Sequence, residues 1–196
     1  MKSFIIIIII ILVLYYYMKQ NNNVYNRAYR LGVRYLDNVI LQPNYAVMFD
    51  IDDTFIDSHH YKPIKPIIKL MKYCNKNDIL VLNITARDSI YTKDTIEELA
   101  LNGIYSKHDN FYPSSKNAIF YDFLYLRKDP EDNHNMFKSN VKERLARKNG
   151  IITIMSIGDN EVDVVGGYSG YSIKLPNTRD PRLFHSDTNG IIVEVR

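Results

Sequence analysis

The fold is decided by the stretch YAVMFDIDDT at residues 45–54. Its first five residues are apolar and rich in β-formers, which is typical of a buried strand in a parallel sheet. Asp50, Asp52, Asp53 and Thr54 follow directly. In an open parallel sheet, ligands bind outside the carboxyl ends of the strands, so residues that follow a strand are the first candidates for chemistry. The sequence therefore predicts a buried strand with an acidic site at its end.

Helices and strands alternate along the rest of the chain. Amphipathic spacing predicts helices over residues 24–40, 64–76, 88–101 and 136–148. Apolar runs predict strands over residues 79–84, 119–126 and 151–157, and short late strands over 171–175 and 191–195. Strands that alternate with helices build parallel sheets from right-handed βαβ units. The expected fold class is α/β, a Rossmann-like parallel sheet with helices on both faces.

Size and composition exclude several classes of protein. The chain has 196 residues, 46% of them hydrophobic and 24% charged, which suits one domain of ordinary size with an appendage. Its single cysteine, Cys74, cannot close an intramolecular disulfide or supply a four-cysteine zinc site. The net charge of +3 comes from Lys and Arg scattered along the chain. We therefore expect no specific nucleic-acid partner.

Residues 4–18 form a nearly pure apolar run between Lys2 and Lys19. A membrane span needs about 17 or more residues, so this run spans only if the tyrosines at its end lie in the interfacial belt. A cleaved secretory signal has a similar apolar core, but no small residues follow at a cleavage position. We expect an uncleaved single-pass membrane anchor, with secretion after cleavage or a buried element as alternatives. The side of the membrane stays open.

Two further strand ends carry polar groups. These are Thr85 and Arg87 after the strand over 79–84, and Gly158, Asp159 and Asp163 after the strand over 151–157. Lys138 lies between them in sequence, at the start of a predicted helix. Taken singly, such acids and hydroxyls most often cap helices and turns. Crowded carboxylates repel one another, however, and a hard divalent cation such as Mg²⁺ brings them together.

The order Asp-x-Asp-x-Thr, Thr, Lys and Gly-Asp-x-x-x-Asp resembles the haloacid dehalogenase superfamily over roughly residues 45–180. The segments 49–54, 158–163 and 174–177 look like the acid phosphatase subfamily (class IIIB-like), which includes plant vegetative-storage-type and bacterial class B phosphatases. Two positions depart from that pattern: Ala86 stands where relatives often have Gly, and Thr178 where a Pro often follows. Neither departure touches the expected nucleophile.

The resemblance implies a role for each matching residue. Asp50 would be the nucleophile that forms an aspartyl-phosphate, and Asp52 the general acid and base. Thr85 and Lys138 would complete the catalytic set by contacting the phosphoryl oxygens, where charge spreads in the transition state. The expected substrate-binding residues are Thr54 and Arg87.

The resemblance also implies a metal, Mg²⁺. Its expected ligands are the carboxylates of Asp50 and Asp159 and the backbone carbonyl of Asp52. Asp163 would lie in an outer position, where it orients Lys138 or a metal-bound water.

Three parts make up the expected organisation: a hydrophobic anchor or signal segment at 1–20, an amphipathic helix at 21–43, and a haloacid-dehalogenase-like phosphatase domain at 44–196. The gaps between the motifs are too short for a large cap domain, so we expect an open site.

The expected function is a Mg²⁺-dependent phosphomonoesterase, with a phosphomonoester substrate that is a small molecule or an exposed phosphate on a macromolecule. One alternative is a polynucleotide 3′-phosphatase, a fold relative with a similar Arg-then-Lys stretch, here Arg127 and Lys138. Such an enzyme would be expected to show a basic groove. Another alternative is a membrane-tethered, catalytically silent binding module. A membrane partner, through residues 4–18, is expected in either case.

Overall fold

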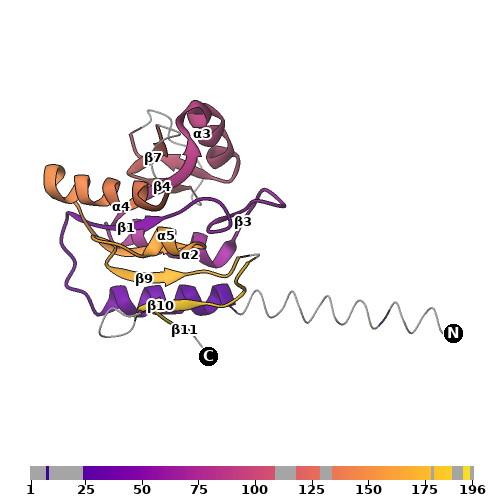
Figure 1. The fold of residues 1–196 in the computed structure, drawn as a ribbon, viewed down its shortest axis with the longest axis horizontal. Helices are drawn as coiled ribbons and strands as arrows, with labels where there is room; N and C mark the ends of the chain where they lie inside the picture. The colour runs from indigo at the N-terminus through magenta and orange to yellow at the C-terminus, as the bar shows by residue number, and fades with distance from the viewer. Residues whose placement is uncertain are drawn as a thin grey trace.

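A seven-stranded sheet forms the centre of the computed structural model, which describes residues 8, 24–108, 118–128, 134–177, 179–186 and 192–194. Its strands are β1 (Tyr45–Phe49), β4 (Leu80–Asp88), β7 (Phe123–Arg127), β8 (Ile152–Gly158), β9 (Tyr171–Lys174), β10 (Phe184–Ser186) and β11 (Ile192–Glu194). Their order is β11-β10-β9-β8-β1-β4-β7, from bottom to top in Figure 1. The strands from β9 to β7 pair in parallel, whereas β10 and β11 are antiparallel. The predicted α/β fold is confirmed, although the sheet is mostly and not wholly parallel.

Helices cover both faces of the sheet. They are residues 24–37, α2 (Lys65–Lys76), α3 (Thr92–Leu101), α4 (His134–Arg144) and α5 (Glu161–Val164). Along β1 the side chains alternate between the faces. Val47 and Phe49 belong to an apolar cluster with α2 and the helix of residues 24–37. Ala46 and Met48 belong to a second cluster that contains Val141 of α4. Both faces of the central strand are therefore buried, as its continuous apolar run predicts.

Small elements fill the gaps between the sequence motifs. A hairpin of β2 (Ile56–Asp57) and β3 (Lys62–Pro63) follows the acidic stretch. After β4 come a 3₁₀ turn over Ser89–Tyr91, α3, and a separate parallel pair of β5 (Ile104–Ser106) and β6 (Ile119–Tyr121). In the part of these gaps that the structure describes, no large cap domain is present.

The strand predicted over residues 119–126 is in fact two strands, β6 and β7, that pair in different sheets. Asp122 separates them. Its backbone N–H donates to the Val81 carbonyl at 2.9 Å, and its carboxylate accepts from the Val81 N–H at 2.8 Å. The carboxylate also pairs with Lys107 at 2.9 Å. Through these three contacts, to Val81 and Lys107, a buried aspartate moves the chain from pairing with β5 to pairing with β4, which apolar periodicity does not reveal.

Other boundaries differ from the prediction by a few residues. β4 continues past residue 84 to Asp88, with an irregular register after Thr85, so its polar end is part of the strand. The helix predicted over 136–148 is α4 followed by a π-helical turn at Leu145–Asn149. It stops at Gly150, whose φ of +68° favours glycine. The short strand β10 was not predicted from the sequence.

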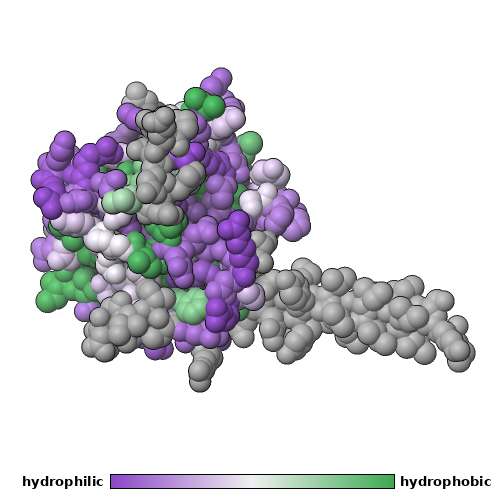
Figure 2. Space-filling model, viewed as in Figure 1, coloured by the Kyte–Doolittle hydropathy of each residue, from purple (hydrophilic) through white to green (hydrophobic). Residues whose placement is uncertain are grey.

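The membrane prediction needs correction. Among the residues that the structure describes, no helix is both long and apolar enough to cross a membrane. The predicted anchor at residues 4–18 lies, apart from Ile8, outside the described residues. The expected membrane localisation and the preceding hydrophobic helix are therefore unsupported, and both are withdrawn. On the face in Figure 2, the coloured surface is mainly hydrophilic.

Candidate active site

Asp50 lies at the carboxyl end of β1, where its backbone N–H donates to the Ile157 carbonyl of β8 at 3.0 Å. The residue is buried, with 5% of its surface exposed. Lys138 of α4, 3% exposed, donates to Asp50 Oδ1 at 2.5 Å and to Asp163 Oδ1 at 2.5 Å. The structure thus brings Lys138 into contact with Asp50, 88 positions before it in sequence, and with Asp163, 25 positions after it.

The loop after β8 is built to hold two more carboxylates. A Cβ at Gly158 would collide with the side chain of Asp163, so only glycine fits there. Asp163 closes a capping box at the start of α5, since its Oδ2 accepts from the Asn160 N–H at 2.9 Å. Asn177 donates to the backbone carbonyl of Asp159 at 2.7 Å. A local contact therefore fixes the Asp163 side chain, and a side chain from further along the chain fixes the backbone of Asp159.

One oxygen from each of Asp50, Asp159 and Asp163 lies within 4.8 Å of the others. Burial raises the pKa of Asp50 to about 8, although Lys138 opposes that change. Burial, followed by the charges of Asp163 and Asp53, raises the pKa of Asp159 to about 6. Burial alone would lower the pKa of Lys138, but Asp50 and Asp163 outweigh it and raise that pKa. A divalent cation would relieve this crowding, and the all-oxygen donor set suits Mg²⁺.

Asp52 lies apart from this cluster and forms an ion pair with Arg87. Arg87 donates from Nε to Asp52 Oδ2 at 2.9 Å and from Nη2 to Asp52 Oδ1 at 2.6 Å. It also donates from Nη1 to Glu98 of α3 at 2.6 Å and to Thr95 at 3.3 Å. The Asp52 side chain is 41% exposed. The expected general acid is therefore held at the solvent side of the site, and its backbone carbonyl as a metal ligand stays a prediction.

The remaining predicted residues lie at the same edge of the sheet. Thr85 is buried, and its Oγ1 accepts from the Arg87 N–H at 3.2 Å. Thr54 is fully buried, and its hydroxyl has no partner among the described residues. A bound ligand or water would satisfy that hydroxyl. Asp53, by contrast, is held within its own loop, where its carboxylate accepts from the backbone N–H and the hydroxyl of Ser58 at 3.0 and 2.6 Å.

Two contributors were not assigned a role from the sequence. Glu98 completes the arginine's set of partners, and it lies 11 residues after Arg87. Asn177 fell inside the segment that carried the family resemblance, but without a role. Glu98 has no local sequence signal, and the signal around Asn177 does not reveal its contact with Asp159, because both contacts are tertiary.

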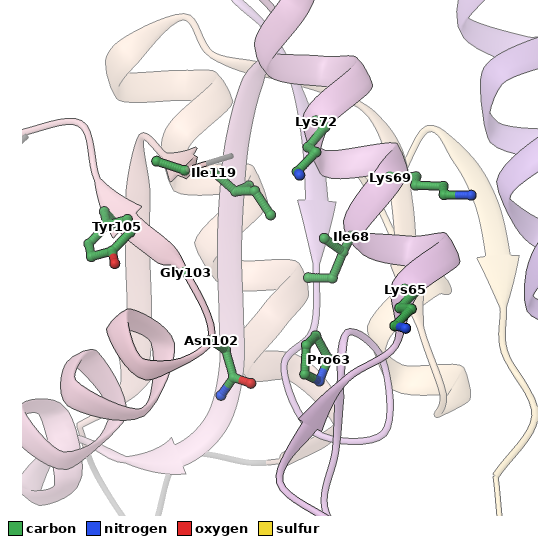
Figure 3. Close-up of a pocket in the computed structure, with 10 residues that line it drawn as sticks. Pro63, Lys65, Ile68, Lys69, Lys72, Asn102, Gly103, Tyr105 and Ile119 are labelled. Carbon is green, nitrogen blue, oxygen red and sulfur yellow. The ribbon is translucent and has the colours of Figure 1, made fainter. Parts of the chain in front are cut away.

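A separate cavity of about 490 Å³ lies between α2 and the β5–β6 pair, and none of the predicted catalytic residues lines it. Three lysines of α2 contribute to its lining, namely Lys65, Lys69 and Lys72, with Ile68 and Ile119 among the apolar residues. Figure 3 shows Lys72 directed toward the cavity and Lys69 directed away from it. No acidic side chain from the described residues lines this cavity.

Comparison with protein-family models and with curated protein sequences gave no match. Among solved structures, the chain is similar to the class C acid phosphatase from Bacillus anthracis, with a TM-score of 0.56 and 18% identity over 75% of this chain and 66% of that one. A form of that enzyme with tungstate bound gives a TM-score of 0.54, again at 18% identity. The Pnkp1/Rnl/Hen1 complex gives a TM-score of 0.49 at 16% identity over 68% of this chain and 46% of the complex chain.

At such low identity, the likeness to the acid phosphatase is one of fold. The chain spans 66% of that enzyme's length. The comparison therefore shows a shared fold and does not by itself assign a family or an activity to this chain. The narrower acid phosphatase subfamily has no support from sequence.

Proposed function

We propose that this protein is a Mg²⁺-dependent phosphomonoesterase of the acid phosphatase type, which acts through an aspartyl-phosphate. The observation that carries the proposal is the buried contact of Lys138 with Asp50 and Asp163 at a strand end. Asp159 lies beside them. A nucleophilic carboxylate, a phosphoryl-binding cation and a set of metal-binding oxygens are the parts that phosphoryl transfer needs. The fold shared with an acid phosphatase agrees with this chemistry.

In the proposed reaction, a carboxylate oxygen of Asp50 attacks phosphorus and forms an acyl-phosphate bond. The ester bond to the leaving oxygen breaks, and that oxygen takes a proton from Asp52. Asp52 then accepts a proton from water, which attacks the phosphorus and releases inorganic phosphate. Asp50 is regenerated as a carboxylate, so two easier displacements replace one difficult one.

Lys138 is proposed to stabilise the charge on the phosphoryl oxygens, because its ammonium is buried beside the nucleophile. Asp50 and Asp159 would hold Mg²⁺, which would neutralise phosphoryl charge when bound. Asp163 is proposed to stay outside the metal's direct ligands, since Lys138 and the Asn160 N–H already occupy its two oxygens.

Arg87 has a proposed role in orienting Asp52. Both carboxylate oxygens of Asp52 accept from the guanidinium, so proton transfer requires at least one of those bonds to open or to be shared. Glu98 and Thr95 anchor the guanidinium from the other side. This arrangement would hold the partly exposed Asp52 carboxylate at the solvent side of the site, where a substrate's leaving group would enter.

The test is turnover of a panel of phosphomonoesters by the full chain, with and without Mg²⁺. We expect release of inorganic phosphate that requires Mg²⁺ and is lost with EDTA. As the matched control, Asp78→Asn removes an exposed carboxyl just before β4, at the opposite edge of the sheet. Binding of phosphate analogues without turnover of any ester would contradict the proposed phosphatase activity and favour the catalytically silent binding module.

The lysines beside the cavity in Figure 3 favour a second candidate, the polynucleotide 3′-phosphatase. Cationic side chains without acidic neighbours suit a polyanionic substrate. The double variant Lys65→Glu, Lys72→Glu should raise the KM for a 3′-phosphorylated oligonucleotide and leave the KM for p-nitrophenyl phosphate unchanged. Equal KM values for the variant and the wild type on the oligonucleotide would remove this candidate.

A further inference from the structure

Lys142 is a buried cation that the proposed reaction does not use. It is fully buried on α4, one helical turn after Lys138 and on the same face. Its Nζ donates to the backbone carbonyl of Asp163 at 3.1 Å and to Ser169 Oγ at 2.6 Å, with a longer contact to Ser156 Oγ at 3.4 Å.

These contacts join four parts of the molecule. Ser156 belongs to β8, Asp163 to α5, and Ser169 to the segment before β9, and Ser156 Oγ donates in turn to the Ser169 carbonyl at 2.8 Å. α5 is a single turn of four residues. Helices this short are held by their surroundings more than by their own hydrogen bonds. The ammonium therefore ties the turn that carries Asp163 to the helix that carries Lys138.

Packing alone does not explain a lysine at this position. Lys142 forms no ion pair with any carboxylate that the structure describes, and its partners are two hydroxyls and a carbonyl. Burial, and then the nearby charge of Lys138, lowers the pKa of Lys142 to about 8. A buried ammonium without a carboxylate costs more to desolvate than an apolar side chain of similar length.

We infer that Lys142 is a positioning residue of the active site, which fixes α5 so that Asp163 holds Lys138 against Asp50. The inference rests on the proposed phosphatase function. Lys142 does not touch the substrate in this scheme, and it acts through the backbone of Asp163. Its loss should therefore lower the rate of the chemical step and leave substrate binding largely unchanged.

The test compares Lys142→Met with Leu145→Ala in the full chain. Leu145 is 2% exposed at the end of the same helical segment, so its truncation lowers Tm without removing a contact to α5. With p-nitrophenyl phosphate and saturating Mg²⁺, at a temperature where both variants are folded, Lys142→Met should lower kcat by about 10- to 100-fold. Its KM should stay within about twofold. Leu145→Ala should keep the wild-type kcat.

Hydrogen exchange of the α5 amides supplies a readout that needs no turnover. The N–H groups of Asp163 and Val165 bond to Asn160 and Glu161 carbonyls within that turn. Their exchange should speed up in Lys142→Met and not in Leu145→Ala. If no ester is turned over by the wild type, the proposed function fails, while the exchange comparison still tests the positioning of α5.

Two outcomes would overturn the inference: wild-type kcat together with wild-type exchange in Lys142→Met, or an equal loss of kcat in Leu145→Ala. Should Lys142→Met fail to fold, Ser169→Ala removes the shortest contact and leaves the lysine in place. It should change kcat and exchange in the same direction by a smaller factor. Wild-type values of both in Ser169→Ala would then count against the inference.

Discussion

The two sides of the acidic site hold their carboxylates in different ways. On one side, Lys138 joins Asp50 and Asp163, and all three side chains are at most 7% exposed. On the other side, Arg87 holds Asp52, whose side chain is 41% exposed. When one partner of a buried ion pair is removed, the remaining charge has no compensation, whereas water solvates the charge that remains from an exposed pair. We therefore expect stability and activity to be coupled on the lysine side and separable on the arginine side.

The largest effect should come from Asp50→Asn. An amide cannot form the acyl-phosphate, so kcat should fall by about 10⁴-fold or more, as for other lost nucleophiles. The side chain keeps its size and the fold should persist, which circular dichroism checks. Turnover of p-nitrophenyl phosphate near the wild-type rate would show that another group is the nucleophile.

Lys138→Met, on the buried side, should lower both the stability and the activity of the protein. It leaves two carboxylates buried without their cation, which typically costs about 3–5 kcal/mol of unfolding free energy. Loss of the phosphoryl-stabilising charge should lower kcat by about 10²- to 10³-fold. Urea unfolding without metal and steady-state kinetics with Mg²⁺ measure the two effects. The matched variant Lys76→Met, at an exposed lysine outside the cavity of Figure 3, should change neither.

Arg87→Met should lower activity far more than it lowers stability. Asp52 loses both donors that orient it, and misplacement of a catalytic group can lower kcat by about 10²-fold. The unfolding free energy should fall by less than in Lys138→Met, because Asp52 regains water, although Glu98, whose side chain is 22% exposed, also loses its ion pair. An equal fall in stability for Arg87→Met and Lys138→Met would erase the distinction between the two sides.

Substitution of Asp159 and of Asp163, two acids of the buried side, should change the Mg²⁺ requirement by different amounts. Asp159→Asn removes a proposed ligand, so the Mg²⁺ concentration for half-maximal activity should rise by about 10- to 100-fold. Asp163→Asn should shift it much less and lower kcat instead, because the Asp163 oxygens accept from Lys138 and Asn160. Titration of both variants with Mg²⁺ decides the matter. Equal shifts would place both carboxylates on the metal.

Sequence reasoning predicted the buried side of the site better than the exposed side. Asp50, Asp159 and Asp163 follow central parallel strands, and the rule that strand ends meet at one edge predicts their proximity. That rule does not give side-chain direction. Asp52 turns to Arg87 and Asp53 turns to Ser58, although all three acids of the stretch were expected to crowd one strand end.

The fold was predictable where the apolar pattern is continuous, as in β1 and β8, and not where one polar residue redirects the chain. Asp122 splits a predicted strand because its contacts to Val81 and Lys107 are tertiary. Lys142 is a similar case. Its sequence context is an ordinary charged helix, and only the fold shows that it is buried.

The smallest predicted effect is the pH dependence of stability with and without Mg²⁺. Measuring it tests whether the buried carboxylates share one cation. Burial raises the pKa of Asp50 to about 8 and that of Asp159 to about 6, both above the ordinary value of 3.8. Between the ordinary and raised values, the folded state holds protons that the unfolded state has lost. The metal-free protein should therefore lose stability as pH rises from about 4 towards 8.

Mg²⁺ binding reverses this trend, because the cation takes the place of the protons on ionised carboxylates and binds only the folded state. At a fixed Mg²⁺ concentration, the rise in Tm on adding metal should thus be larger at pH 8 than at pH 5.5. Asp159→Asn should flatten that dependence, while Asp94→Asn, at an exposed carboxyl on α3, should preserve it. A rise in Tm that is independent of pH would mean that Mg²⁺ binds elsewhere, and the shared-cation model of the buried side would have to be abandoned.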